Sequence, residues 1–141
     1  MGVMLHRASH KCLRRLICTE EGLCFGSGKE KLPSILVSQG HGIVCTDVPE
    51  QEGMDWQTHD LNDLFYPDLI DRDTFERNVS FRPVDMNVIP DDLRDFDFLW
   101  STGTLEHIGG HANGVRFVEN AMECLRLGGI AVHSAEFTIT I

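Results

Sequence analysis

Short apolar runs alternate along the chain with segments of helical periodicity. Residues 22–25 (GLCF) form an apolar run that predicts a strand, and residues 32–39 repeat at helical spacing until Gly40 ends the helix. Residues 41–47 (HGIVCTD) predict a second buried strand. A strand, a helix and a strand within about 30 residues indicate a right-handed crossover unit with two parallel strands.

The same alternation continues through the rest of the chain. A connection is expected over 48–66, with a short helix near 60–64, followed by a strand at 79–83 and a strand at 96–100 that ends at Ser101. Val115, Val118, Met122 and Leu125 repeat at helical spacing and predict a helix that stops at Gly128 and Gly129. A last strand is expected within 130–140. Acid-rich runs at 68–76 and 90–97 are interpreted as solvated loops and helix starts. The pattern predicts an α/β fold, a doubly wound and mostly parallel sheet of about five strands with flanking helices, whose ligands lie beyond the carboxyl ends of the strands.

Length and composition favour one globular domain. The chain has 141 residues, of which 42% are hydrophobic, enough for a single core. We interpret residues 1–20 as a lead-in and residues 21–141 as the domain. No apolar run has the length of a signal peptide or a membrane span, so a soluble protein without a membrane partner is expected.

Charge and cysteine content exclude further classes. The formal net charge of -10 opposes the attraction that drives binding to nucleic acid, so no nucleic-acid partner is expected. The five cysteines are unclustered and show no C-x-x-C spacing, which indicates neither a zinc site nor a disulfide framework. A reducing, cytosolic setting fits this cysteine content best.

A glycine turn after the first strand is the first candidate site. Gly26 and Gly28 allow a ligand to approach the backbone, and Asp47 follows Gly28 by 19 residues at the end of the next strand, the spacing at which a carboxylate reaches ribose hydroxyls. The alternative interpretations are an ordinary strand-to-helix turn and a solvated aspartate. Lys31 stands where a dinucleotide fingerprint requires glycine, and Glu30 stands where a P-loop requires Ser or Thr. A nucleoside without a pyrophosphate is therefore favoured.

Several ordered segments carry a resemblance to a known family. They are FGSG after the first strand, VCTD at the end of the second, VDMNVIP after the third, FDFLWSTGTLEHI at the fourth and ECLRLGGIAVHS before the fifth. Between about residues 22 and 135 the chain resembles class I S-adenosylmethionine-dependent methyltransferases, particularly the methyltransferase type 11-like small-molecule group with LEH after the fourth strand. That family has a seven-stranded sheet, so the resemblance implies a chain that lacks the last strands of the fold.

The resemblance implies S-adenosylmethionine as cofactor, S-adenosylhomocysteine as product, and a set of contacts. Gly26 and Gly28 would line the amino-acid portion of the cofactor, Asp47 would accept from its ribose, Asp85 and Met86 would contact adenine, and Ser101 and Thr102 would line the methionine end. The expected cofactor-binding residues are Phe25, Gly26, Ser27, Gly28, Asp47, Val48, Asp85, Met86, Ser101 and Thr102. The chain departs from the family pattern at Cys24, where an acidic residue is common, and at Glu30, where a third glycine is common.

His107 is the candidate catalytic residue. It could act as a general base for a hydroxyl acceptor, and in the alternative interpretation the LEHI segment only packs the loop. His111, His133 and Glu136 match no compact ligand motif, so no metal is expected.

Three functions remain open from the sequence. The leading one is methyl transfer to a small-molecule or saccharide acceptor, at oxygen. The second is a non-catalytic Rossmann-like remnant that serves in association, and the third is a nicotinamide-dependent oxidoreductase. The apolar FTITI end of the fifth strand also predicts self-association into a homo-oligomer through that strand edge.

Overall fold

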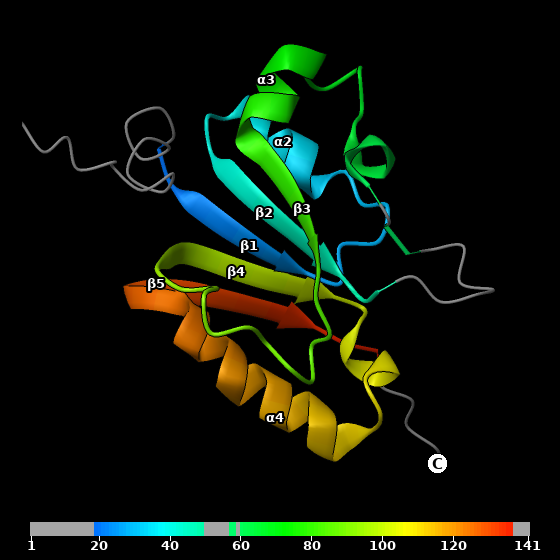
Figure 1. Cartoon of the computed structure of the whole chain (residues 1–141), viewed down its shortest axis with the longest axis vertical. Helices are drawn as coiled ribbons and strands as arrows, with labels where there is room; N and C mark the ends of the chain where they lie inside the picture. The colour runs from blue at the N-terminus through cyan, green and yellow to red at the C-terminus, as the bar shows by residue number, and fades with distance from the viewer. Residues whose placement is uncertain (1–18, 50–56, 59, 137–141) are drawn as a thin grey trace, which may run out of the picture.

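The sheet consists of short strands that all run in the same direction. The computed structural model describes residues 19–49, 57, 58 and 60–136. The strands are β1 (Glu21–Phe25), β2 (Gly42–Asp47), β3 (Val79–Pro83), β4 (Phe96–Thr102) and β5 (Leu125–Ser134). They lie in the order β3-β2-β1-β4-β5, and every neighbouring pair is parallel (Figure 1). The strand order reverses between β1 and β4, which is where such sheets bind their ligands.

Helices connect the strands and pack on both faces of the sheet. The α-helices are α2 (Leu32–Ser38), α3 (Arg72–Asn78) and α4 (His111–Ala121), and the 3-10 helices are η1 (Leu61–Leu64), η2 (Leu105–His107) and η3 (Met122–Cys124). Helices α2 and α3 cover one side of the sheet, and α4 lies on the other side, along β4 and β5 (Figure 1). The two layers of helices leave the carboxyl ends of the strands accessible to a ligand.

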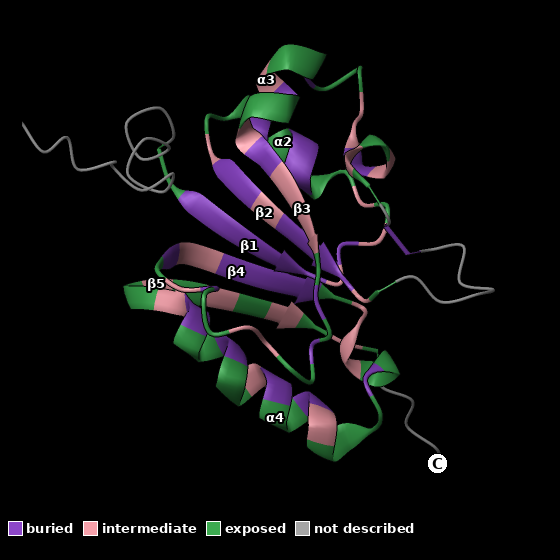
Figure 2. Cartoon of the chain, viewed as in Figure 1, coloured by how far each residue is buried: buried purple, intermediate pink, exposed green. Residues whose placement is uncertain are grey.

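Successive side chains of β1 pack alternately on the two faces of the sheet. Leu23 and Phe25 point into the core under α4, where the rings of Phe25 and Phe117 meet edge to face at 5.0 Å between centroids. Cys24 points into the core under α2 and α3. All of β1 is buried (Figure 2). A central strand covered on both faces needs apolar residues throughout, which explains the unbroken GLCF run.

The predicted α/β sheet of about five parallel strands is confirmed. The expected helix from residue 32, the short helix near 60–64 and the strand at 79–83 are found as α2, η1 and β3. Helix α3 begins within the acid-rich run at 68–76, and the carboxylate of Asp71 caps it by accepting from Thr74 N at 2.9 Å. That hydrogen bond lowers the pKa of Asp71.

The predicted helix through Leu125 is wrong at its carboxyl end. Helix α4 ends at Ala121, and Leu125 already pairs with Phe96 as the first residue of β5. Gly128 has a φ of +81° and lies between Leu125 and Ile130, where the pairing of β5 with β4 shifts register. The two glycines therefore form an irregularity within a strand and do not end a helix.

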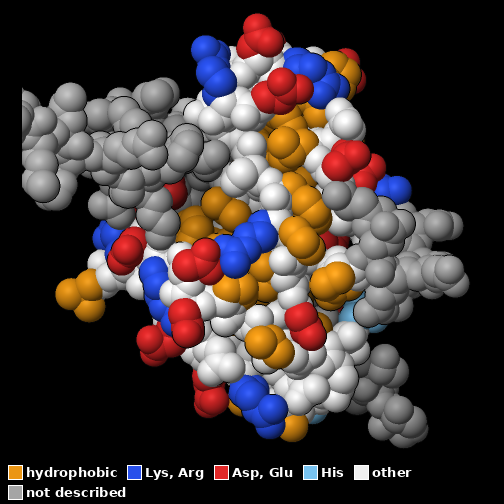
Figure 3. Space-filling model, viewed as in Figure 1, with side chains coloured by type: hydrophobic (Ala, Val, Ile, Leu, Met, Phe, Trp, Pro, Cys, Tyr) orange, Lys and Arg blue, Asp and Glu red, His pale blue; other side chains and the backbone are white. Residues whose placement is uncertain are grey.

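The described surface carries charges of both signs. Lys and Arg side chains lie among Asp and Glu side chains on the face drawn in Figure 3. In the part of the chain that the structure describes, no helix is long and apolar enough to cross a membrane.

Cys24, Cys45 and Cys124 are buried free thiols, and burial raises the pKa of each. The cytosolic setting stays a prediction.

Strand β5 is an edge strand of the described sheet and carries exposed apolar side chains. Leu127 is 100% exposed, Ile130 65% and Val132 61%. An unpaired strand edge with apolar side chains favours pairing with another chain. Self-association through β5 is therefore retained as a proposal, and the FTITI segment, residues 137–141, lies outside the described residues.

We predict that the chain self-associates at micromolar concentration and that the double variant Ile130→Lys/Val132→Lys weakens this association. Two ammonium groups on β5 would have to be desolvated or would repel those of the second copy. Sedimentation velocity across a concentration series measures the effect. Val88→Lys, at an apolar side chain that is 73% exposed between β3 and β4, is the matched control. A wild-type chain that stays monomeric at high micromolar concentration would contradict the prediction.

Candidate functional site

The candidate site lies at the carboxyl ends of β1 and β2, beside the loop that follows β4. A cavity of about 410 Å³ opens there, within the roughly 300–1,000 Å³ of small-molecule pockets. The lining residues come from separate segments of the chain and are Gly26, Gly28, Asp47, Val48, Gln57, Met86, Gly103, Thr104, His107 and Ile108. Predicted residues from the first, second and third strand ends and from the LEH segment are thus brought together.

The turn after β1 requires glycine. Gly26 has a φ of +61° and Gly28 a φ of +50°, a conformation that other residues rarely adopt. A Cβ at Gly26 would lie 2.3 Å from Cγ2 of Thr104. The absence of that Cβ therefore lets the β1 turn and the loop after β4 meet at the cavity.

Asp47 binds backbone N–H groups from three segments. Its Oδ2 accepts from Gly28 N at 3.0 Å and from Thr58 N at 3.0 Å, and its Oδ1 accepts from Val48 N at 2.8 Å. The residue is only 6% exposed, and hydrogen bonds to a carboxylate are stronger than neutral ones. Asp47 thus organises the site before any ligand binds, and its contact with a ribose stays a prediction.

The loop after β3 brings Met86 to the cavity. Val84 N donates to Asp47 O at 2.7 Å, and Asp85 Oδ1 accepts from Asn87 N at 2.8 Å. This turn leaves Met86 only 2% exposed, while Asp85 is exposed to solvent. Met86 offers an apolar surface to the cavity and Asp85 does not line it, so the adenine contact of each stays a prediction.

The 3-10 helix η2 forms one wall of the cavity. The side-chain amides of Asn87 and Asn113 both donate to Ile108 O, at 3.2 and 2.9 Å. Within the turn, His107 N donates to Thr104 O at 3.0 Å. These bonds fix the turn, and His107 lines the cavity from it. The predicted general base therefore lies at the candidate site.

Besides Asp85, four predicted cofactor residues do not line the cavity. Phe25 is fully buried under α4, and the Ser27 hydroxyl donates to a main-chain oxygen of β2 at 3.1 Å. Strand β4 extends to Thr102, beyond the predicted end, so Ser101 and Thr102 belong to the strand. Ser101 is only 1% exposed, and Thr102 lines a separate hollow on the α2 side.

Sequence analysis missed four lining residues: Gln57, Gly103, Thr104 and Ile108. Gly103 has a φ of +59° and begins the loop after β4. The glycine in STGT was the available signal, because it marks the first position at which the backbone can leave the strand. Gln57 lies in a bend with no periodic pattern, so nothing in the sequence singled it out.

Ser101 pairs with a histidine of the neighbouring strand. Its Oγ lies 2.8 Å from Nδ1 of His133, and the His133 ring packs edge-on to Phe117 at 5.6 Å. The Nε2 of His133 is buried without a partner among the described residues, and burial lowers the pKa of this imidazole. The pair joins β4 to β5 as a neutral group.

The two positions that depart from the family pattern contact each other. Glu30 Oε1 accepts from Cys24 Sγ at 3.1 Å and from Trp100 Nε1 at 2.8 Å. Burial raises the pKa of the Cys24 thiol well above its usual value, so it acts as a neutral donor. A carboxylate therefore lies against the end of β1, although the turn carries it at position 30.

The residues that line the cavity fit a nucleoside cofactor. A turn without Cβ, a carboxylate and an apolar side chain form its different walls. Thr104 Oγ1 is buried without a hydrogen-bond partner among the described residues, 3.5 Å from where a Gly26 Cβ would lie, and could bind a polar ligand atom. No group of three His, Cys, Asp or Glu side chains among the described residues could hold a metal ion.

Comparison with known proteins gives matches only at the level of structure. No family model matches the chain, and no curated protein matches it. The TehB-like SAM-dependent methyltransferase from Corynebacterium glutamicum aligns with a TM-score of 0.55 and 21% identity, over 82% of this chain and 54% of that one. The CcbJ methyltransferase from Streptomyces caelestis aligns with a TM-score of 0.62 and 16% identity, over 85% and 45%.

A third structure is phosphoethanolamine N-methyltransferase 1 from Haemonchus contortus, in complex with phosphoethanolamine and S-adenosylhomocysteine. It aligns with a TM-score of 0.53 and 16% identity, over 78% of this chain and 21% of its own. The chain has the fold of class I S-adenosylmethionine-dependent methyltransferases. It spans about half the length of the first two structures.

We predict that Cys24→Asp lowers the free energy of unfolding by about 3 kcal/mol, because a buried carboxylate at position 24 would face the partly buried carboxylate of Glu30. Adding Glu30→Gly should restore much of this loss, since one carboxylate remains to accept from Trp100. Urea unfolding of the two single variants and the double variant measures the coupling. If the losses in free energy of unfolding of the two single variants add up to the loss in the double variant, positions 24 and 30 do not interact and the prediction is contradicted.

We predict that His133 makes the fold less stable in mild acid. Its pKa is lowered from 6.5 in the folded chain, so the unfolded chain binds the proton more readily and stability falls as the pH drops below 6.5. Urea unfolding at about pH 7.5 and about pH 5.5 should show a smaller difference for His133→Gln than for the wild type. An equal difference in both chains would refute this role.

Proposed function

We propose that the chain binds S-adenosylmethionine and transfers its methyl group to an oxygen of a small-molecule acceptor, releasing S-adenosylhomocysteine. The main support is a single cavity at the point where the strand order reverses. The strained glycine turn, the Asp47 carboxylate and the apolar side chain of Met86 lie around it. The shared fold with methyltransferases supports the same reaction class.

The cofactor would supply a methyl group already activated by a positively charged sulfonium. The protein then has to hold the acceptor oxygen in line with that methyl and to receive its proton. His107 lines the cavity, and we assign it as the base that takes the hydroxyl proton. With the cofactor bound, the carbon–oxygen bond would form as the carbon–sulfur bond broke, and His107 would hold the proton that the hydroxyl loses.

Titration calorimetry with S-adenosylmethionine, S-adenosylhomocysteine and NAD tests the cofactor. Heat is expected with both sulfur nucleosides and none with NAD. A folded protein that gives no heat with either sulfur nucleoside would overturn the proposal and favour a non-catalytic association module. Binding of NAD alone would favour a nicotinamide-dependent oxidoreductase.

The same titration with Asp47→Asn should show affinity for S-adenosylhomocysteine weaker by about tenfold or more. An amide cannot accept the three backbone N–H groups as the carboxylate does, so the glycine turn loses its support. Asp73→Asn, an exposed aspartate on α3, is the matched control. Circular dichroism confirms that both variants are folded, and unchanged affinity in folded Asp47→Asn would count against the site.

A further inference from the structure

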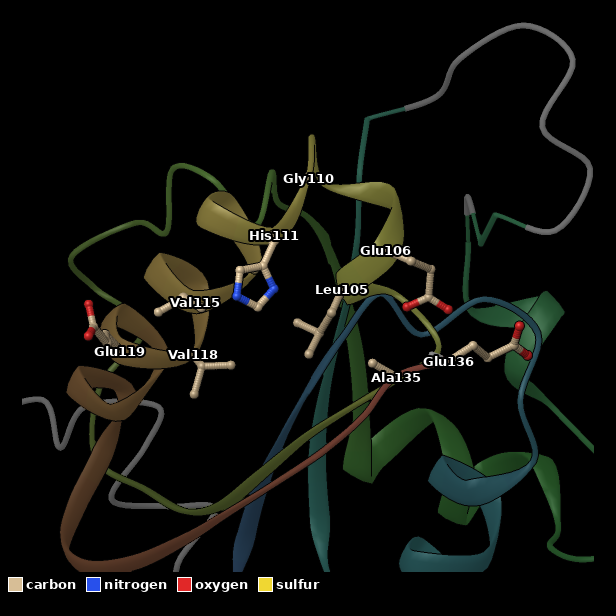
Figure 4. Close-up of a pocket in the computed structure, with 10 residues that line it drawn as sticks. Leu105, Glu106, Gly110, His111, Val115, Val118, Glu119, Ala135 and Glu136 are labelled. Carbon is tan, nitrogen blue, oxygen red and sulfur yellow. The ribbon is translucent and has the colours of Figure 1, made fainter. Parts of the chain in front are cut away.

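A second cavity lies on the other side of η2 from the candidate cofactor site. Its volume is about 630 Å³, and it is bounded by the first turns of α4, by η2 and by the residues that follow β5 (Figure 4). Leu105 and Glu106 of η2 line this cavity, whereas His107 of the same turn lines the cofactor cavity. One helical turn therefore separates the two spaces.

Glu106 lies at the boundary between them. Gly103 lines the cofactor cavity, and a Cβ at Gly103 would lie only 3.8 Å from Oε1 of Glu106. A molecule in the second cavity that reaches Glu106 would thus lie next to the cofactor cavity. Because methyl transfer requires reacting atoms about 3–3.5 Å apart, this neighbourhood is where an acceptor must lie.

The floor of the second cavity is apolar. Leu105, Val115 and Val118 face the same space, the first from η2 and the other two from α4 (Figure 4). Val115 is 47% exposed. Helix α4 lies close to η2 at Gly114, where a Cβ would be in ordinary van der Waals contact with Leu105 O at 3.6 Å. Such a floor favours a hydrocarbon body over a sugar, whose hydroxyls would lose hydrogen bonds to water.

The rim of the cavity is acidic. Glu106 and Glu136 lie at one end and Glu119 at the other, with His111 between them (Figure 4). In the described part of the chain no Lys or Arg lines the cavity. An apolar floor between carboxylates attracts a positively charged molecule and repels an anionic one.

We propose that this cavity binds the methyl acceptor and that the acceptor is an apolar molecule carrying a positively charged amino group. The inference rests on the proposed function, because only a methyltransferase needs an acceptor there. The hydrocarbon part lies on Leu105, Val115 and Val118, and the carboxylates of the rim hold the positive charge. The oxygen that receives the methyl group lies at the Glu106 end.

Calorimetry with three amphiphiles that carry an eight-carbon alkyl chain tests the proposal: octyltrimethylammonium, octyl glucoside and nonanoate. They present a cation, a neutral sugar and an anion on the same apolar chain. At low ionic strength, where surface charges are least screened, the cation should bind about tenfold more tightly than nonanoate. Val118→Lys, which adds a positive charge to the floor, should abolish this preference.

The triple variant Glu106→Gln/Glu119→Gln/Glu136→Gln should lose most of the preference for the cation. All three side chains are exposed, so the fold should be retained, which circular dichroism checks. Glu123→Gln, an exposed glutamate on η3 that does not line the cavity, is the matched control and should keep the preference. Equal binding of the three amphiphiles, or a preference that survives the triple variant, would overturn the inference.

Binding of S-adenosylhomocysteine, measured on the same samples, separates this inference from the proposed function. If S-adenosylhomocysteine binds and the cation is not preferred, the acceptor class is wrong and the cofactor assignment stands. If the cation is preferred and S-adenosylhomocysteine does not bind, the cavity is no acceptor site and both proposals fail.

Discussion

The carboxylate of Asp47 is the interaction on which the candidate site depends. It accepts N–H groups from the glycine turn, from the start of the β2–β3 connection and from Thr58 farther along it. None of these segments forms a helix or strand at that point. A buried, multiply bonded carboxylate ties them together at the end of a rigid strand. The backbone that a cofactor would approach is therefore ordered by the protein itself.

Glu30 fastens the other side of the same turn. Asp47 joins the turn to β2 at Gly28, and Glu30 joins it to β4 through Trp100. The turn is thus held across the point where the strand order reverses, which is the place where the sheet can bind a ligand. Cys24 and Glu30 are departures from the family pattern when each is considered alone. Together they place a carboxylate against the end of β1.

The sequence predicts the central strands β1, β2 and β4 well because they are largely buried, and buried parallel strands are nearly continuous apolar runs. The prediction from sequence is wrong where the same local pattern is typical of two different structures. Gly128 has the appearance of a helix stop, and only the pairing of Leu125 with Phe96 shows that it lies within a strand. Within the site, a residue at a strand end such as Asp47 can be predicted from its distance along the sequence to the glycine turn. Ser101 is expected at the site from the resemblance alone, and it lies within β4 because the end of that strand depends on its pairing with β5, which no local pattern encodes.

The residues that line the proposed acceptor cavity are the hardest to predict from the sequence, for a related reason. Glu106, Glu119 and Glu136 are far apart in the chain and match no motif, and they share a cavity only because α4 returns the chain to β5 beside β4. Long-range geometry of this kind cannot be recovered from spacing. The turn η2 connects the two cavities, because Leu105 and Glu106 line the proposed acceptor cavity and His107 of the same turn lines the cofactor cavity. A substitution in η2 would therefore affect binding in both cavities.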